Sequence, residues 1–210
     1  KLGAAADKEL INSAPNLKYI GMFGTGCGRI DTMYAANKGV AVCNIVGYST
    51  EGVAELAFGA ILDQLREIER GKVQAREGNY LETTFQGSEI KGKVFGIIGL
   101  GRIGSRIAEI AKHGFEADVR YWNMTKREDY EKQGIRYQEI NDLLKEADFL
   151  SLNLAYVPET KGFLDEKRIK QIKQGNLVIN LAPMELVDIN ALEKRLQLGD
   201  ITFLFDHSDE

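Results

Sequence analysis

Hydrophobic and polar positions along the second half of the chain predict six short buried strands separated by helices. Strand patterns fall at residues 94–99, 118–123, 135–137, 148–154, 176–181 and 201–206. Helical patterns lie between them, most clearly over residues 140–145, 166–173 and 189–198. Strands that alternate regularly with helices are typical of an α/β fold with a doubly wound parallel sheet. We expect that fold for this part of the chain.

The first half predicts a smaller α/β segment followed by one long helix. Helical patterns cover residues 4–13 and 30–37, and strand patterns cover residues 17–23 and 40–44. An apolar stripe, with Thr50 as N-cap and Gly71 as the stop, predicts a helix over residues 51–70. A polar arm, residues 72–89, then leads to the next strand. The stripe is either a core face or a surface that contacts a partner.

Three glycines follow the strand at residues 94–99 and open a helical pattern. Gly99 suits a tight turn out of the strand, Gly101 lets the backbone approach a pyrophosphate, and Gly104 lets the helix pack closely on the strand. The helix N-terminus would then face the phosphates of a dinucleotide. This order of strand, glycines and helix predicts a Rossmann site for NAD or NADP. The alternative is a purely structural glycine turn.

The end of the second strand of this sheet bears on the choice between NAD and NADP. An NAD site places Asp or Glu there, about twenty residues after the glycines, to bind the ribose hydroxyls. This chain has Asn123 instead, which does not repel a 2′-phosphate. Thr125, Lys126 and Arg127 add donors and positive charge. Alternatively, Lys126 and Arg127 simply begin a surface helix with the acidic residues that follow.

Composition excludes several other classes of protein. The 210 residues are 44% hydrophobic and 28% charged, with a net charge of −4 and no long basic run, so nucleic acid is not an expected partner. We expect no membrane partner, because no apolar run approaches the roughly 20 residues of a membrane span. Cys27 and Cys43 lack the spacing of a disulfide framework or metal site, which fits a cytoplasmic protein. Because the chain starts without Met, we expect a piece of a longer protein.

Segments spread over nearly the whole chain carry a family resemblance. They are residues 15–18, 24–31, 49–55, 96–104, 158–162 and 187–188. Together they resemble the D-isomer-specific 2-hydroxyacid dehydrogenase family. The resemblance implies that residues 1–46 are part of a flavodoxin-like substrate domain and residues 47–210 an NAD(P)-binding Rossmann domain. It also implies hydride transfer between NAD(P)H and a 2-oxo or 2-hydroxy acid, and a homodimer formed through the nucleotide-binding domain.

The resemblance also places further cofactor residues on this sequence. Those it implies are Arg102 and Ile103 beside the diphosphate, Asn123 at the ribose, Leu154, Ala155 and Thr160, the backbone of Leu181, Ala182 and Pro183, and Asp206 near the nicotinamide amide. The glycine-rich turn at Gly24, Thr25 and Gly26 could hold a small anion such as a substrate carboxylate through its N–H groups. It is otherwise a flexible strand-to-helix turn.

The chain departs from the family pattern at the positions for catalysis. Where the family has an Arg that clamps the substrate carboxylate, this chain has Pro183. The family's acid–base Glu and His fall near or beyond the last residue, which leaves His207 and Glu210 as candidates. His207 is otherwise a surface histidine. Pro183 therefore keeps a second function open, that of a noncatalytic NAD(P)-binding regulatory or scaffold protein.

Overall fold

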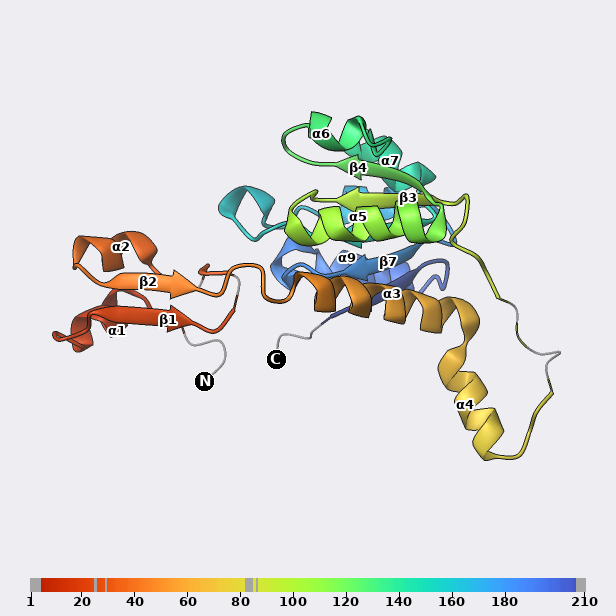
Figure 1. Cartoon of the computed structure of the whole chain (residues 1–210), viewed down its shortest axis with the longest axis horizontal. Coiled ribbons are helices and arrows are strands. Elements are labelled where there is room, and N and C mark those ends of the chain that lie inside the picture. Colours follow the sequence, from red (N-terminus) through yellow and green to blue (C-terminus); the bar gives the residue numbers. More distant parts are fainter. Residues whose placement is uncertain (1–4, 25, 29, 82–84, 86, 207–210) are drawn as a thin grey trace. The chain divides into compact units, whose positions relative to one another are not determined.

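A computed structural model describes residues 5–24, 26–28, 30–81, 85 and 87–206. The chain separates into two compact units, residues 1–49 and residues 50–210 (Figure 1).

Unit 1 is a small α/β unit with two parallel strands, β1 (Tyr19–Met22) and β2 (Ala41–Asn44). Its helices are α1 (Lys8–Ser13) and α2 (Thr32–Asn37). Both begin at an aspartate, because Asp7 and Asp31 accept hydrogen bonds from backbone N–H groups one turn later. Ile11, Ala35 and Val40 form its buried core.

Unit 2 is built on one six-stranded parallel sheet with the order β5-β4-β3-β6-β7-β8. The strands are β3 (Val94–Ile98), β4 (Asp118–Trp122), β5 (Arg136–Tyr137), β6 (Phe149–Leu152), β7 (Leu177–Asn180) and β8 (Thr202–Phe205). The order reverses between β3 and β6, and ligands of such sheets bind outside the carboxyl ends of the strands at this point. The predicted doubly wound α/β fold is confirmed.

Helices cover both faces of this sheet. The helices α3 (Thr50–Arg66) and α5 (Arg102–Phe115) cover one face, and α7 (Ile140–Glu146), α8 (Glu166–Gln171) and α9 (Ile189–Leu196) cover the other. Alternate side chains of β3 point to opposite faces, so that Phe95 and Ile97 pack with α3 and α5 while Ile98 packs with the other three helices. Further helices among the described residues are α4 (Ile68–Arg76), α6 (Glu128–Glu131), η2 (Pro158–Thr160) and η3 (Met184–Leu186).

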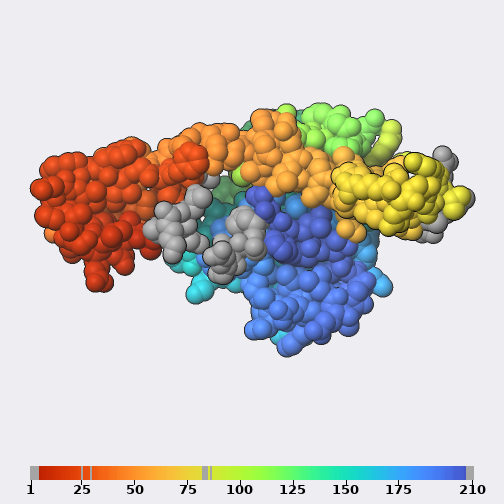
Figure 2. All heavy atoms as spheres, turned by 90° about the horizontal axis from the view of Figure 1, so that it is seen from below, coloured from red at the N-terminus to blue at the C-terminus, as the bar shows by residue number. Residues whose placement is uncertain are grey.

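The single helix predicted over residues 51–70 is wrong, because the chain forms two helices there. Glu67 lies between α3 and α4 with a left-handed backbone (φ 50°, ψ 44°), which interrupts the helix. Gly71, predicted as the stop, lies inside α4, so the predicted polar arm begins as helix. No side chain of α4 is buried, and Figure 2 shows this helix, in yellow, at one end of unit 2.

Other predicted elements differ from the structure only at their ends. The helix predicted over residues 4–13 is observed from Lys8 because Asp7 is its N-cap. Thr50, predicted as an N-cap, is the first residue of α3. The strand predicted over residues 17–23 is observed as the shorter β1.

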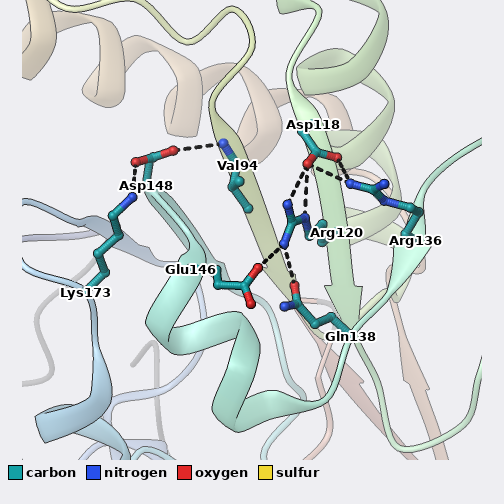
Figure 3. Close-up of polar contacts among 8 residues, drawn as sticks. All are labelled: Val94, Asp118, Arg120, Arg136, Gln138, Glu146, Asp148 and Lys173. Atoms are coloured by element: carbon teal, nitrogen blue, oxygen red, sulfur yellow. Dashed lines mark hydrogen bonds and ion pairs between the residues drawn. The ribbon is translucent and has the colours of Figure 1, made fainter.

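An ion-pair network joins β4 and β5 near the amino edge of the sheet, opposite the carboxyl ends of the strands (Figure 3). Arg120 donates to Asp118 and Gln138 and pairs with Glu146. Arg136, on β5, donates to both carboxylate oxygens of Asp118 at 2.7 Å. Asp118 therefore holds an arginine from each of the two strands.

Asp148, just before β6, makes a second connection at this edge (Figure 3). Its carboxylate accepts from the Val94 N–H at 2.9 Å and from the Lys173 ammonium at 2.6 Å. Burial alone would raise the pKa of Asp148, but these two hydrogen bonds outweigh it and bring the pKa below the ordinary 3.8. The carboxylate thus stabilises the fold at neutral pH, and this stabilisation is lost as the pH falls below about 4.

Asp148→Asn should lower the free energy of unfolding by about 1–3 kcal/mol at pH 7, because the amide cannot pair with Lys173. The difference from the parent should shrink towards pH 3, below the ordinary pKa of 3.8, because the unfolded parent then binds a proton at this carboxyl more readily than the folded parent does. Urea denaturation at pH 7, 5 and 3 measures this. Glu166→Gln is the matched control, since Glu166 pairs with Lys170 on an exposed helix face, where solvent screens the ion pair, and should change the stability much less. An equal loss at pH 3 and pH 7 would show that the charge of Asp148 is not what stabilises the fold.

Candidate functional site

The predicted cofactor residues gather at the carboxyl edge of the sheet. Backbone hydrogen bonds continue the strand pairing past the strand ends, where Gly99, Asn153, Leu181 and Asp206 donate to neighbouring strands. The predicted cofactor residues that follow the strand ends at this edge are Gly99 after β3, Asn123 after β4, Leu154 and Ala155 after β6, Leu181, Ala182 and Pro183 after β7, and Asp206 after β8.

Close contacts shape the glycine turn between β3 and α5. Gly99 has a φ of 96°, a backbone angle that residues other than glycine rarely adopt. A Cβ on Gly104 would lie 2.1 Å from the Gly99 carbonyl oxygen, so only glycine lets α5 pack this closely on the turn. A Cβ on Gly101, in contrast, would meet no atom of the described residues within 4 Å. The fold therefore needs Gly99 and Gly104, whereas Gly101 leaves open space at the start of the helix.

Helix α5 begins at this open space. Its N-cap is Gly101, and no side chain among the described residues caps it, whereas an aspartate caps α1, α2, α8 and α9. The first N–H groups of a helix carry partial positive charge and suit an anion. Arg102 is exposed and Ile103 half-buried in the first turn. The pyrophosphate of a dinucleotide fits both the space and the charge.

At the end of β4, Asn123 binds the glycine turn. Its Oδ1 accepts from the Leu100 N–H at 3.3 Å, and its Nδ2 donates to the Thr125 carbonyl at 3.0 Å. The Lys126 ammonium lies 4.4 Å from the ring centroid of Tyr137. The end of β4 is therefore followed by the Asn123 amide and then by the positively charged Lys126.

Arg127 lies immediately before α6, so the predicted surface helix begins one residue after it. Its Nη1 donates to the Leu100 carbonyl at 3.0 Å, and its Nε and Nη2 donate to the two oxygens of Asp129 at 3.1 and 2.9 Å. These bonds lower the pKa of Asp129 and raise that of Arg127. Both side chains are therefore ionised at neutral pH.

The loop after β6 is closed by Thr160, which is 4% exposed. Its hydroxyl accepts from the Val157 N–H at 2.9 Å and lies 2.8 Å from the Ala155 carbonyl and 3.0 Å from the Val157 carbonyl. The hydroxyl is thus engaged inside its own loop, where it fixes the backbone of Ala155.

The turn after β7 is held by Asn180, which is 1% exposed. Its amide nitrogen donates to the Ala182 carbonyl at 2.9 Å and to Met184 Sδ at 3.2 Å, and its Oδ1 accepts from the Ala182 N–H at 3.1 Å. Pro183 follows with φ −55° and has no N–H to donate. This turn therefore presents a rigid backbone with no cation at residue 183.

Part of the predicted substrate and catalytic set, namely Thr25, His207 and Glu210, lies outside the described residues. Gly24 follows β1 in unit 1, where its N–H donates to the Met22 carbonyl and its carbonyl accepts from the Ile45 N–H, both at 3.0 Å. Gly26 lies two residues further along the same turn. Among the described residues, no three His, Cys, Asp or Glu side chains gather as a metal ion would require. In the same part of the chain, every helix is too short or too polar to cross a lipid bilayer.

Three further residues, Leu100, Tyr121 and Asn180, contribute to the site beyond those predicted from the sequence. Tyr121 is fully buried in β4, where its hydroxyl accepts from the Arg127 N–H at 2.6 Å and donates to Glu131 at 2.9 Å. Burial raises the pKa of Tyr121, so the hydroxyl keeps its proton. The position of Tyr121 within a strand pattern does not distinguish it from other core residues. Asn180 gives a signal, because it is a polar residue that ends an apolar strand.

A doubly wound sheet with a glycine turn and an open helix start at its switch point defines an NAD(P)-binding domain. Residues 58–209 match the family described as D-isomer specific 2-hydroxyacid dehydrogenase, NAD binding domain. The chain belongs to this family, and the predicted binding of NAD or NADP is confirmed at that level.

Relatives with solved structures or curated names support the assignment. The glyoxylate reductase of Thermococcus litoralis is 36% identical over 201 residues, which cover 92% of this chain and 60% of that protein. The D-lactate dehydrogenase of Aquifex aeolicus, complexed with NAD and lactic acid, has a TM-score of 0.85 at 33% identity and covers 96% of this chain and 62% of that chain. An acyclic imino acid reductase in complex with NADPH and D-Arg has a TM-score of 0.86 at 30% identity, over 99% of this chain and 68% of that chain. The chain spans about three fifths of the length of the curated relatives it matches.

The two glycines of the turn should separate binding from folding. Gly101→Val fills only open space, so it should shift the unfolding temperature by less than about 3 °C, yet weaken NADH binding at least about tenfold. Gly104→Ala places a methyl group against the Gly99 carbonyl oxygen, and overpacking of this kind costs about 1–3 kcal/mol. Thermal unfolding and NADH fluorescence titration measure both effects. Equal nucleotide affinity of Gly101→Val and the parent would show that the pyrophosphate lies elsewhere.

Proposed function

We propose that this chain supplies the cofactor-binding part of an oxidoreductase that moves hydride between NADH or NADPH and a 2-oxo or 2-hydroxy acid. The open space at Gly101, beside the start of α5 that no side chain of the described residues caps, is the observation that carries the proposal. The nicotinamide cofactor supplies the hydride when bound. The names of the relatives, glyoxylate reductase and D-lactate dehydrogenase, support the substrate class.

The residues of the chain bind and orient the cofactor in this proposal. Thr160 acts through its loop, which fixes the backbone beside the cofactor. The direct contacts are Gly99, Gly101, Arg102, Ile103 and Gly104 at the diphosphate, Asn123, Thr125 and Lys126 at the adenine ribose, and Leu154, Ala155, Leu181, Ala182, Pro183 and Asp206 towards the nicotinamide.

The remaining assignments extend this proposal to the whole protein. Residues 1–46 belong to a substrate domain, in which the turn at residues 24–26 holds the substrate carboxylate, and residues 47–210 form the NAD(P)-binding domain. A homodimer would cover the exposed apolar side chains Leu56, Ile68 and Val73 of α3 and α4. The free thiols of Cys27 and Cys43 fit a reducing, cytoplasmic setting.

Pro183 favours a second function for the same fold. An arginine at this position would make a charge-assisted, bidentate contact with a substrate carboxylate and orient it for reaction. Proline has neither charge nor donor. A noncatalytic protein that binds NAD(P) and regulates or organises a partner would keep the cofactor contacts without this clamp.

Asn123→Asp tests the assignment of the β4 end to the ribose. A carboxylate there should repel a 2′-phosphate and weaken NADPH binding at least about tenfold more than NADH binding. Asn123→Ala is the matched control, because it removes the hydrogen bond to Leu100 without adding charge and should weaken both nucleotides alike. Fluorescence titration with both nucleotides gives the answer, and equal effects of Asn123→Asp on the two would remove Asn123 from the ribose site.

Turnover by the full-length protein decides between the two functions. The parent should reduce pyruvate, glyoxylate and hydroxypyruvate slowly, since loss of a desolvated ion pair costs about 3–5 kcal/mol, or roughly two to four decades in rate. Pro183→Arg should raise kcat/KM by at least about tenfold, while Pro183→Gln, which lacks the charge, should not. NADH and NADPH oxidation is the assay. Rapid turnover by the parent would eliminate the noncatalytic function, whereas nucleotide binding without turnover in both proteins would favour it.

A further inference from the structure

The peptide groups on either side of Leu100 are both fixed by side chains that follow β4. The Leu100 N–H donates to Asn123, and the Leu100 carbonyl accepts from Arg127 Nη1 at 3.0 Å. Leu100 itself is 1% exposed. It lies between Gly99 and Gly101, so these two hydrogen bonds act at the centre of the glycine turn.

Because the peptide bond is planar, these two hydrogen bonds also fix the directions of the neighbouring backbone groups in the glycine turn. In a trans peptide the C=O and the following N–H point in opposite directions. Because the Leu100 carbonyl points towards Arg127, the Gly101 N–H points away from Arg127. In the same way, the hydrogen bond to Asn123 turns the Gly99 carbonyl to the opposite side. Arg127 therefore helps to set the direction of the Gly101 N–H in the proposed pyrophosphate site, together with the Ser105 hydroxyl, which donates to the same Leu100 carbonyl at the longer distance of 3.5 Å.

Arg127 is itself held on several sides. Two of its three guanidinium nitrogens donate to Asp129, and the guanidinium carbon lies 4.9 Å from the ring centroid of Tyr130. Its backbone N–H donates to the buried Tyr121 hydroxyl. The third nitrogen is thereby directed at the Leu100 carbonyl, and the positive charge is paired with the Asp129 carboxylate.

We propose that Arg127 is a positioning residue that fixes the glycine turn in its cofactor-binding shape and is not a ligand of the 2′-phosphate of NADP. The inference departs from the sequence prediction, which placed Arg127 beside that phosphate, and it rests on the proposed cofactor site. Both NADH and NADPH have a pyrophosphate, so both depend on the turn. Selection between them then falls to Asn123, Thr125 and Lys126.

The test compares the affinities of the full-length protein for NADH and NADPH in three variants. Arg127→Met and Arg127→Lys should each weaken both nucleotides by the same factor, about tenfold or more, because neither can donate at once to Leu100 and to both oxygens of Asp129. The ratio of the two dissociation constants should stay within about twofold of the parent ratio. Lys126→Met is the matched control from the adjacent position and should weaken NADPH more than NADH. Arg127→Lys keeps the positive charge. If circular dichroism shows that Arg127→Met is unfolded, the affinities of Arg127→Lys alone are compared with those of the parent.

A second readout reports on the turn without any nucleotide. The Gly101 amide resonance should move in Arg127→Met and Arg127→Lys and stay in place in Lys126→Met, because Arg127 donates to the carbonyl of that peptide and Lys126 does not. Loss of NADPH affinity alone, full affinity for both nucleotides, or restoration of NADPH binding by Arg127→Lys would each overturn the positioning role. Failure of the parent to bind either nucleotide would instead overturn the proposed function, and the inference with it.

Discussion

The close approach of α5 to the end of β3 is the constraint on which unit 2 depends. With only hydrogen atoms on Gly104, the first turn of the helix lies directly against the Gly99 carbonyl. This contact sets the path of α5 across the sheet, where Ile107, Ala108 and Ala111 are fully buried. It also places the positive end of the helix at the point where the strand order reverses. A packing requirement and a charge requirement are therefore met by the same two glycines.

Most of the fold could be predicted from periodicity, because a strand buried on both faces reads as a continuous apolar run. The strands at Phe149–Leu152 and Leu177–Asn180, buried at every position, show this plainly. The break at Glu67 could not be predicted, because a single left-handed residue leaves the apolar spacing of α3 and α4 almost intact. The Asp63 carboxylate accepts from the Glu69 N–H across this break at 3.1 Å, a contact that the apolar spacing does not reveal, and Glu has no strong preference for a left-handed backbone.

Some features of the candidate site could likewise be predicted from the sequence, and others could not. The glycine turn was predictable because each glycine is needed for a local reason that spacing reveals. The bond between Arg127 and Leu100 was not, since the two residues are 27 positions apart and the sequence does not show which carbonyl an arginine will reach. The role of Thr160 was hidden for a related reason. A polar side chain predicted near a ligand is equally able to fasten the loop that carries it, and only coordinates show which of its atoms are engaged.

The network around Asp118 also affects whether copies of the chain can associate through the edge of the sheet. The strand β5 is an edge strand of only two residues, and Arg136 on it is bound to Asp118 of its neighbour. An edge strand with free backbone groups is a template for strands of other molecules, and natural proteins guard such edges with short length and charge. Here both devices occur together. The β5 side of the sheet is therefore a poor starting point for aggregation, even when many copies of the chain are crowded together.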